Sequence, residues 1–128
     1  MPAREIPISE AESRVMQPLW QQSPQSSDQV VAAVQADSDW HEKTIRTLLN
    51  RLLGKGAVRA EKDGRRYLYS AVLTREQWQS QESRSLLDRV FGGRMAPLLT
   101  HFCRHEKLGE KDIAELRKLL DAIERRER

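Results

Sequence analysis

The chain has 128 residues, of which 32% are charged and 38% are hydrophobic, and its formal net charge is +3. This length suits one domain or a small domain with an appendage, and no apolar run approaches the length of a membrane span. A single cysteine excludes an intramolecular disulfide and fits a reducing compartment. The N-terminal residues lack the basic and apolar segments of a secretory signal, so we expect a soluble, cytoplasmic protein.

The charges are distributed unevenly along the chain. Residues 1–42 have a net charge of −5, whereas residues 43–66 have eight basic and two acidic residues and a net charge of +6. Residues 67–128 have a net charge of +2. A local excess of cations is the electrostatic footprint expected of a surface that binds nucleic acid. Residues 43–66 are therefore the first candidate for a functional surface.

Two helices are expected before this basic segment. Residues 1–8 should form a short arm, and Ser9-Glu10-Ala11-Glu12 has the spacing of a capping box. The helix that begins there should end near Gln22, before Ser23-Pro24, and Ser26 or Ser27 should cap the second helix. The apolar residues expected to be buried by these helices are Ala11, Val15, Leu19, Trp20, Val30, Val31 and Val34.

A third helix, beginning near Trp40, has two contrasting faces. Its apolar residues have the i, i+3, i+4, i+7, i+8 spacing of one buried helix face: Ile45, Leu48, Leu49, Leu52 and Leu53. The opposite face has hydrogen-bond donors and no acidic residue: Lys43, Thr44, Arg46, Thr47, Asn50 and Arg51. Such side chains suit phosphates and base edges in a DNA groove, although a solvated helix that happens to be basic is the alternative. Asp39 or His41 should cap the start of the helix, and Gly54 and Gly56 should stop it.

A basic hairpin is expected after this helix. Two strand-like runs, residues 57–62 and 65–72, flank Asp63-Gly64, which predicts a type I′ turn with positive φ at both of these residues. Three helices followed by a hairpin indicate a winged helix-turn-helix. The side chains at the tip of the wing, where a DNA phosphate would lie, are Lys62, Arg65 and Arg66.

The C-terminal part is expected to be helical. Thr74-Arg75-Glu76-Gln77 is a second capping box, and the helix that begins there should end at Gly92-Gly93 and connect the DNA-binding domain to two more helices. The first of these is short, with Pro97 in its first turn, and the second is amphipathic from Glu110 to Arg128.

We expect these helices to pair with a second copy of the chain, since they cannot form much of a core alone. The alternative is that they fold back on their own winged helix. The expected domains are a winged-helix DNA-binding domain, residues 1–73, and a helical dimerisation domain, residues 74–128. The expected dimerisation residues are Leu86, Leu87, Val90, Phe91, Leu98, Leu99, Phe102, Ile113, Leu116, Leu119, Leu120 and Ile123.

The chain resembles the BlaI/MecI/CopY family of penicillinase and methicillin-resistance repressors. The residues that carry this resemblance in the third helix are Trp40, Lys43-Thr44-Ile45-Arg46-Thr47-Leu48, Arg51-Leu52 and Lys55-Gly56. The opening helix, the wing and Gly92-Gly93 also fit, so the resemblance covers nearly the whole chain. It implies a mainly α fold with a small β-hairpin wing, and a homodimeric repressor that binds palindromic operators in double-stranded DNA upstream of resistance genes or its own gene.

The resemblance also has implications for individual residues. It implies that Lys43, Thr44, Arg46 and Arg51 lie close to DNA. The chain departs from the family at His41-Glu42, where members often have Ser or Thr followed by Pro, and Glu42 would repel a phosphate if it pointed outward. Members are inactivated by cleavage between Asn and Phe, and the matching bond here joins His101 and Phe102. The implied partner is a membrane-bound sensor protease system, and the chain itself is not expected to insert into a membrane. The alternatives are that a different enzyme cuts the bond or that the bond is not cut at all.

Other functions are weakly supported. His101 and His105 share a helix face, but Cys103 points away from it and zinc normally has four ligands, so we expect no metal site and no cofactor. Cys103 is a candidate redox switch, but a buried small hydrophobic residue is the favoured interpretation. No nucleophile–base pair or phosphate-binding loop indicates an enzyme. The alternatives to a repressor are a metal- or redox-responsive regulator and a winged-helix protein-interaction module that does not bind DNA.

Overall fold

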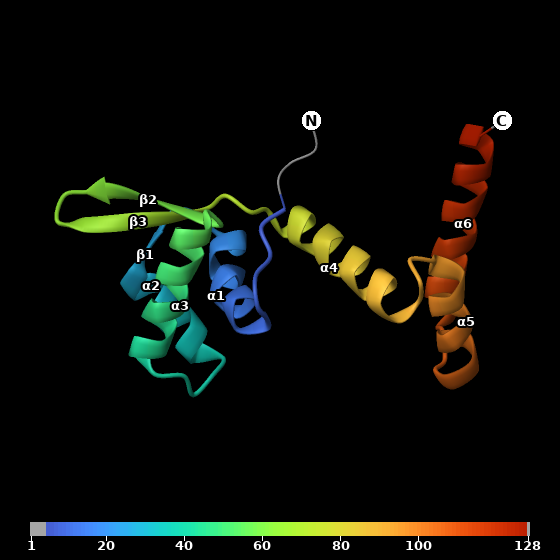
Figure 1. The fold of residues 1–128 in the computed structure, drawn as a ribbon, viewed down its shortest axis with the longest axis horizontal. Helices are drawn as coiled ribbons and strands as arrows, with labels where there is room; N and C mark the ends of the chain where they lie inside the picture. Colours follow the sequence, from blue (N-terminus) through green and yellow to red (C-terminus); the bar gives the residue numbers. More distant parts are fainter. Residues whose placement is uncertain (1–4, 128) are drawn as a thin grey trace. The chain divides into compact units, whose positions relative to one another are not determined.

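The computed structural model describes residues 5–127, without the side chain of Glu127 (Figure 1). The chain divides into two compact units, of which the first ends at Glu82 and the second begins at Ser83. Residues 1–4 of the expected arm, and Arg128 at the end of the last expected helix, lie outside the described residues.

Three helices and a small sheet form the first unit. The helices are α1 (Glu10–Gln21), α2 (Ser27–Ala36) and α3 (Glu42–Lys55), and each packs against the other two. The capping box at α1 is confirmed, because the Glu12 amide donates to Ser9 Oγ at 3.0 Å and the Ser9 amide donates to Glu12 Oε1 at 2.8 Å. The expected serine cap of α2 is Ser26, whose Oγ accepts from the Gln29 amide at 3.2 Å.

Helix α3 begins after His41, which makes no side-chain capping bond, and ends at Gly56. Gly56 has a φ of +83°, the left-handed conformation of a C-cap. The expectation that Gly54 also stops the helix is wrong, since Gly54 lies inside α3. One left-handed residue is enough to end a helix, and here only Gly56 adopts that conformation.

The core of the first unit is formed by apolar residues from every helix and from the sheet. Four of the five apolar residues predicted on α3 are buried there, but Leu53 is 38% exposed. Eight residues after Ile45, a helical side chain is rotated by about 80° and lies at the edge of the apolar face. Trp20 and Trp40 pack against this core and are partly buried. The buried residues are Ile8, Val15, Met16, Leu19, Val30, Val31, Val34, Ile45, Leu48, Leu49, Leu52, Ala57, Val58 and Leu73.

The sheet has three antiparallel strands in the order β1-β3-β2. Strands β2 (Val58–Asp63) and β3 (Arg66–Ala71) are the predicted hairpin, whereas β1 (Gln25–Ser26) was not predicted, because two residues are too few to show an alternating pattern. Asp63 pairs with Arg66, so the two turn residues are Gly64 and Arg65. Only Gly64 has positive φ, +64°, which is the type II′ pattern, and the predicted type I′ turn is wrong.

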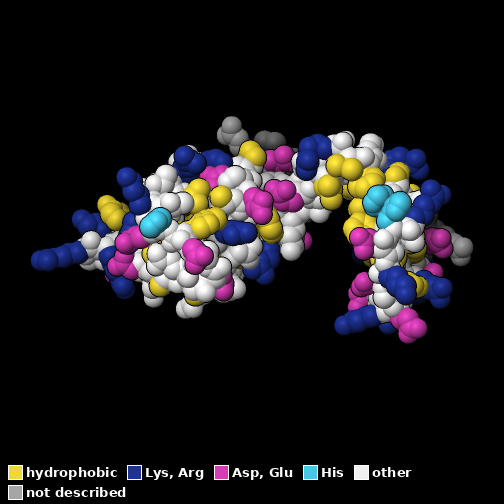
Figure 2. All heavy atoms as spheres, turned by 90° about the horizontal axis from the view of Figure 1, so that it is seen from below, with side chains coloured by type: hydrophobic (Ala, Val, Ile, Leu, Met, Phe, Trp, Pro, Cys, Tyr) yellow, Lys and Arg dark blue, Asp and Glu magenta, His cyan; other side chains and the backbone are white. Residues whose placement is uncertain are grey.

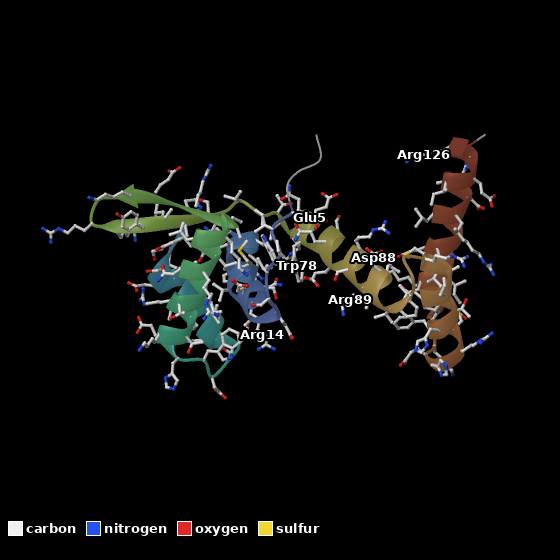
Figure 3. The ribbon with its side chains drawn as sticks, viewed as in Figure 1. Glu5, Arg14, Trp78, Asp88, Arg89 and Arg126 are labelled. Carbon is white, nitrogen blue, oxygen red and sulfur yellow. The ribbon has the colours of Figure 1, made fainter. Side chains whose placement is uncertain are left out.

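Helix α4 (Arg75–Val90) belongs to both units. Its predicted capping box is confirmed, since the Gln77 amide donates to Thr74 Oγ1 at 3.1 Å and the Thr74 amide donates to Gln77 Oε1 at 2.9 Å. The first half of α4, which includes Trp78 (Figure 3), packs on the winged helix. The ring centroids of Trp78 and Trp20 are 4.9 Å apart. Gln81 also forms two hydrogen bonds with the backbone of Ile6, of 3.0 and 2.9 Å. The expected connector is therefore limited to the second half of α4.

The second unit contains the rest of α4, α5 (Met95–His105) and α6 (Glu110–Glu127). Gly92 and Gly93 end α4 as predicted, with φ values of +59° and +79°, and the Gly93 amide donates to the Leu87 carbonyl at 2.8 Å. Leu87 is the only buried side chain among the described residues of this unit. Within residues 5–127, no helix is both long enough and apolar enough to cross a membrane.

Candidate nucleic-acid interface

The predicted DNA-binding residues of α3 lie together on one face of the helix. Lys43, Arg46, Thr47 and Asn50 line one shallow hollow with Glu42. Thr44 and Arg51 are exposed on the same helix, opposite the buried apolar residues. Among these predicted residues, two cations and three uncharged hydrogen-bonding side chains are exposed to solvent, whereas Arg46 is half-buried.

The predicted wing residues lie at the free end of the β2–β3 hairpin. Lys62, Arg65 and Arg66 are all exposed, and Figure 2 shows basic side chains gathered at this end of the first unit. Arg66 Nη2 is 3.5 Å from Asp63 Oδ2. An exposed ion pair of this kind contributes little free energy, so it leaves Arg66 available for a phosphate.

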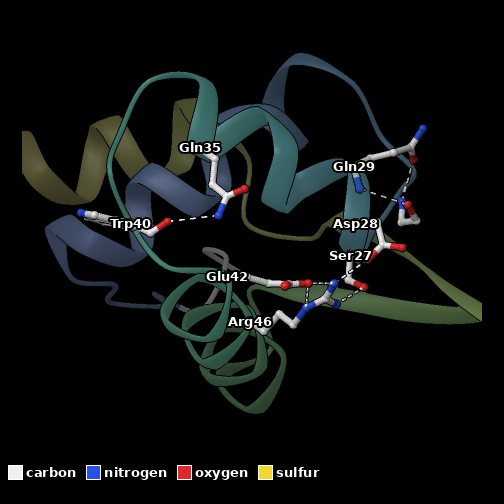
Figure 4. A network of polar contacts seen from close by, with 8 residues as sticks. Ser27, Asp28, Gln29, Gln35, Trp40, Glu42 and Arg46 are labelled. Atoms are coloured by element: carbon white, nitrogen blue, oxygen red, sulfur yellow. Dashed lines mark hydrogen bonds and ion pairs between the residues drawn. The ribbon is translucent and has the colours of Figure 1, made fainter.

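Arg46 donates hydrogen bonds to two carboxylates and one hydroxyl group (Figure 4). Its Nε donates to Glu42 Oε1 at 2.9 Å, and its Nη2 donates to the same oxygen at 2.6 Å and also to Asp28 Oδ1. Its Nη1 donates to Ser27 Oγ at 2.8 Å. The hydrogen bonds that Arg46 donates to Asp28 and Glu42 raise its pKa above the ordinary value, so this guanidinium stays charged.

Asp28 is a site residue that sequence reasoning did not identify, and Glu42 was considered there only as a residue that would repel a phosphate if it pointed outward. The i, i+4 spacing of Glu42 and Arg46 is a recognisable helical ion pair, but Asp28 is 18 residues away from Arg46 and no local pattern joins them. Asp28 is in the first turn of α2, where a negative charge also suits the helix dipole. The structure thus adds two carboxylates to a surface that the sequence indicated to be cationic.

Two sets of contacts fix the ends of α3. At its C-terminal end, Lys55 Nζ donates to Glu12 Oε1 at 2.6 Å and to the Pro7 carbonyl at 3.3 Å. Burial alone would raise the pKa of the Glu12 carboxyl, but hydrogen bonds from Lys55 and Ser9 lower it overall. At the other end Trp40 packs against the core, as predicted, with the Arg14 guanidinium 5.4 Å from its ring centroid.

The predicted dimerisation residues in the second unit are mostly accessible. Leu87 is buried, and the others are partly or largely exposed, with Val90, Leu119 and Leu120 more than half exposed. Partly buried residues are Phe91, Leu98, Leu99 and Leu116, and exposed ones are Leu86, Phe102, Ile113 and Ile123.

The His101–Phe102 bond lies inside α5. The His101 ring is 4.6 Å from the His105 ring, centroid to centroid, and Phe102 is 43% exposed. Cys103 is exposed, so the expectation of a buried small hydrophobic residue is wrong. Among residues 5–127 there is no cluster of three or more His, Cys, Asp or Glu side chains that could hold a metal ion.

The family model for the penicillinase repressor matches residues 8–122 of the chain. The chain belongs to the penicillinase repressor family. It is 31% identical over 126 residues to the penicillinase repressor of Staphylococcus aureus, covering 98% of this chain and all of that protein. It is 32% identical over 114 residues to the methicillin resistance regulatory protein MecI of Staphylococcus aureus strain N315, covering 89% of this chain and 93% of that one.

Solved structures of this repressor family support the same fold. The solution structure of the DNA-binding domain of the repressor BlaI is 36% identical and covers 59% of this chain and 93% of that chain, with a TM-score of 0.52. The monomeric form of Bacillus licheniformis BlaI in complex with the blaP half-operator is also 36% identical, covers 57% and 90%, and has a TM-score of 0.51. The predicted winged helix is confirmed, and because the penicillinase repressor family consists of transcriptional repressors, the prediction of a regulator instead of an enzyme is confirmed too.

Proposed function

We propose that this chain is a homodimeric, DNA-binding transcriptional repressor that acts in the cytoplasm on palindromic operators of β-lactam resistance genes. One observation carries the proposal: an exposed basic face of α3 beside a basic wing, in a domain 36% identical to BlaI, which was solved with the blaP half-operator. Helix α3 would lie in the major groove and the wing over the phosphate backbone.

The residues proposed to contact DNA divide into two groups. The exposed face of α3 would contact base edges and nearby phosphates, because its side chains are donors of the kind that bind guanine, adenine and phosphate oxygens. The wing would contact phosphates, because three long cationic side chains lie at or beside its tip. The first group is Lys43, Thr44, Thr47, Asn50 and Arg51, and the second is Lys62, Arg65 and Arg66. Arg46 lies on the same face but is half-buried and already hydrogen-bonded within the protein.

Dimerisation is proposed to use the apolar faces of the second unit. Leu119 is 55% exposed and Leu120 is 57% exposed, and the exposed apolar residues of α6 share one helical spacing. Contiguous exposed apolar surface of this kind marks an interaction site in soluble proteins. A second copy of the same chain would cover it with the same surface, as two-fold interfaces do, and would present two winged helices to a palindrome.

Release from DNA is proposed to follow cleavage of the bond between His101 and Phe102 by a membrane-bound sensor protease system. Cleavage there would detach residues 102–128, which include all of α6. Since the bond is helical, α5 has to unfold locally before a protease can bind it. Exposing cells to a β-lactam and mapping the fragments by mass spectrometry tests this step. Intact chain persisting while its target genes switch on would contradict cleavage and favour an effector that acts on the whole dimer.

The DNA-binding proposal is tested by selecting duplexes from a random-sequence pool with the purified chain and measuring their affinity. Lys43→Ala should weaken binding to the selected duplex by about 1–3 kcal/mol if Lys43 contacts a base edge. Lys107→Ala is the matched control, because Lys107 is an exposed lysine between α5 and α6 and should change affinity little. Failure of the unaltered chain to select any sequence would contradict the proposed function.

The wing is tested separately through the salt dependence of binding. Arg65→Ala should weaken binding to selected and random duplexes alike, and should lower the slope of log affinity against log salt concentration by about one. A change in the selected sequence would instead mean that the wing contacts bases.

A further inference from the structure

The contacts of Arg46 point to a role different from that of the other basic residues of α3. All three of its guanidinium nitrogens are engaged, by Glu42, by Asp28 and by Ser27 Oγ. A guanidinium has five N–H groups, and four of its hydrogen bonds are already formed within the protein. Bidentate binding of a guanine needs two free N–H groups on one edge, and that edge is occupied while these contacts last.

The two carboxylates bound to Arg46 are open to solvent. The side chain of Asp28 is 85% exposed and that of Glu42 is 58% exposed, while that of Arg46 is 36% exposed. Glu42 lines the same hollow as Lys43, Thr47 and Asn50, the residues proposed to approach DNA. Without Arg46, these two carboxylates would place a charge of −2 where DNA phosphates would approach. With Arg46 bound to them, the net charge of the three groups is −1, so the repulsion is weaker.

The same contacts also connect two helices. Arg46 is in the second turn of α3, whereas Ser27 and Asp28 form the first turn of α2. The guanidinium therefore links the start of α2 to the exposed face of α3 (Figure 4). A planar group with several donors in a fixed geometry suits this role better than a lysine ammonium, which binds as a point charge.

We propose that Arg46 is a positioning residue of the DNA-binding surface: it offsets one of the two negative charges of Glu42 and Asp28 and holds α3 against the start of α2, and it does not determine which bases are bound. This proposal rests on the proposed DNA-binding function. It also explains how the chain tolerates Glu42 at a place where an outward carboxylate would repel phosphate, since Glu42 points along the helix to Arg46.

The test is a set of mutant cycles measured by fluorescence anisotropy, with the duplex that the unaltered chain selects from a random pool. The carboxylates are removed together by Asp28→Asn and Glu42→Gln in three backgrounds: the unaltered chain, Arg46→Met and Lys43→Met. Lys43 is the matched control, because it is a cation in the same hollow and forms no ion pair among the described residues. Circular dichroism and thermal unfolding of each variant check that the fold is kept.

We expect Arg46→Met to weaken binding about tenfold, the change in affinity that ~1.4 kcal/mol produces. Removing the two carboxylates should then improve binding by Arg46→Met about tenfold more than it improves binding by the unaltered chain. In the Lys43→Met background the improvement should match that of the unaltered chain within about twofold, as independent sites do. Duplexes reselected with Arg46→Met should have the same preferred sequence.

Two results would overturn the inference. Equal improvement in all three backgrounds would mean that Arg46 acts on DNA independently of Glu42 and Asp28. Loss of preference at one base position on reselection with Arg46→Met would mean that Arg46 contacts that base. Either result leaves the DNA-binding function intact, whereas an unaltered chain that selects no sequence contradicts the function and the inference together.

Discussion

The two compact units bury their apolar side chains to very different extents. The winged helix encloses a core of fourteen residues, several of them fully buried. In the second unit, Leu87 is the only buried side chain among those described. Yet α3 and α6 have apolar residues at the same helical spacing, so an apolar face alone does not say what will cover it. In α3 the cover is α1, α2 and the sheet; for α6 we propose that it is a second copy of the chain.

We propose that this difference separates stability from assembly in the chain. The winged helix has the packing that a domain needs to fold independently, while the second unit has the exposed surface that an interface needs. Mutations in the two units should therefore have different signatures, and four experiments test that division.

The largest effect is expected in the core of the winged helix. Leu49 is 1% exposed, so Leu49→Ala should lower the free energy of unfolding by about 2–5 kcal/mol at every protein concentration. Leu120→Ala is the matched change in the second unit, where the side chain is 57% exposed. It should reduce only the part of the stability that depends on protein concentration. Denaturant unfolding at several protein concentrations measures both effects. Equal losses of unfolding free energy for the two variants in dilute protein would contradict the proposed difference between the two units.

A truncation tests whether assembly resides in the second unit. Because Trp78 and Gln81 pack on the winged helix, the fragment should end at Glu82. This fragment should be folded and monomeric. It should bind a palindromic duplex about 10²–10⁴-fold more weakly than the full chain, because two separate winged helices lose the effective concentration that a dimer provides at the second half-site. Sedimentation equilibrium and anisotropy provide the two measurements. A fragment that dimerises at micromolar concentration would place the interface elsewhere.

The boundary between the two units can be tested inside α4. Trp78→Ala removes the ring packed on Trp20 and should lower the free energy of unfolding by about 1–3 kcal/mol, from lost apolar burial and the aromatic pair. Arg89→Ala is the control in the second half of the same helix, where the side chain is exposed (Figure 3); its effect should stay below about 0.5 kcal/mol. Similar losses for both would mean that α4 stabilises the fold along its whole length.

The smallest expected effect concerns the ion pair of Lys55 and Glu12. Lys55→Met leaves a buried carboxylate without its cation, and because Lys55 is itself 41% exposed, the cost should be only about 1 kcal/mol near neutral pH. The pKa of Glu12 is lowered in the fold, so its contribution is present above the ordinary carboxyl pKa of 4.5 and is lost as the pH falls below that value. The difference in stability between the two proteins should therefore shrink in acid; a difference that is constant with pH would contradict this.

Much of the fold follows from the sequence because its signals are local. Capping boxes at Ser9 and Thr74, the left-handed Gly56 and the helical spacing on α3 each involve residues within a few turns of one another. The hydrogen bonds and backbone conformations within such short segments depend little on the rest of the molecule. The same holds for the basic face of α3 and the wing, which are patterns of neighbouring residues and were therefore foreseeable as a candidate site.

Only the tertiary structure decided the contacts between distant residues. Strand β1 exists because Gln25 and Ser26 meet β3, and the first half of α4 is held by Trp20, more than fifty residues earlier in the chain. Asp28 reaches Arg46 because α2 packs against α3. The sequence by itself determined which residues could form helices, a hairpin and a cationic face, whereas packing decided which of those cations are available to DNA and which are bound within the protein.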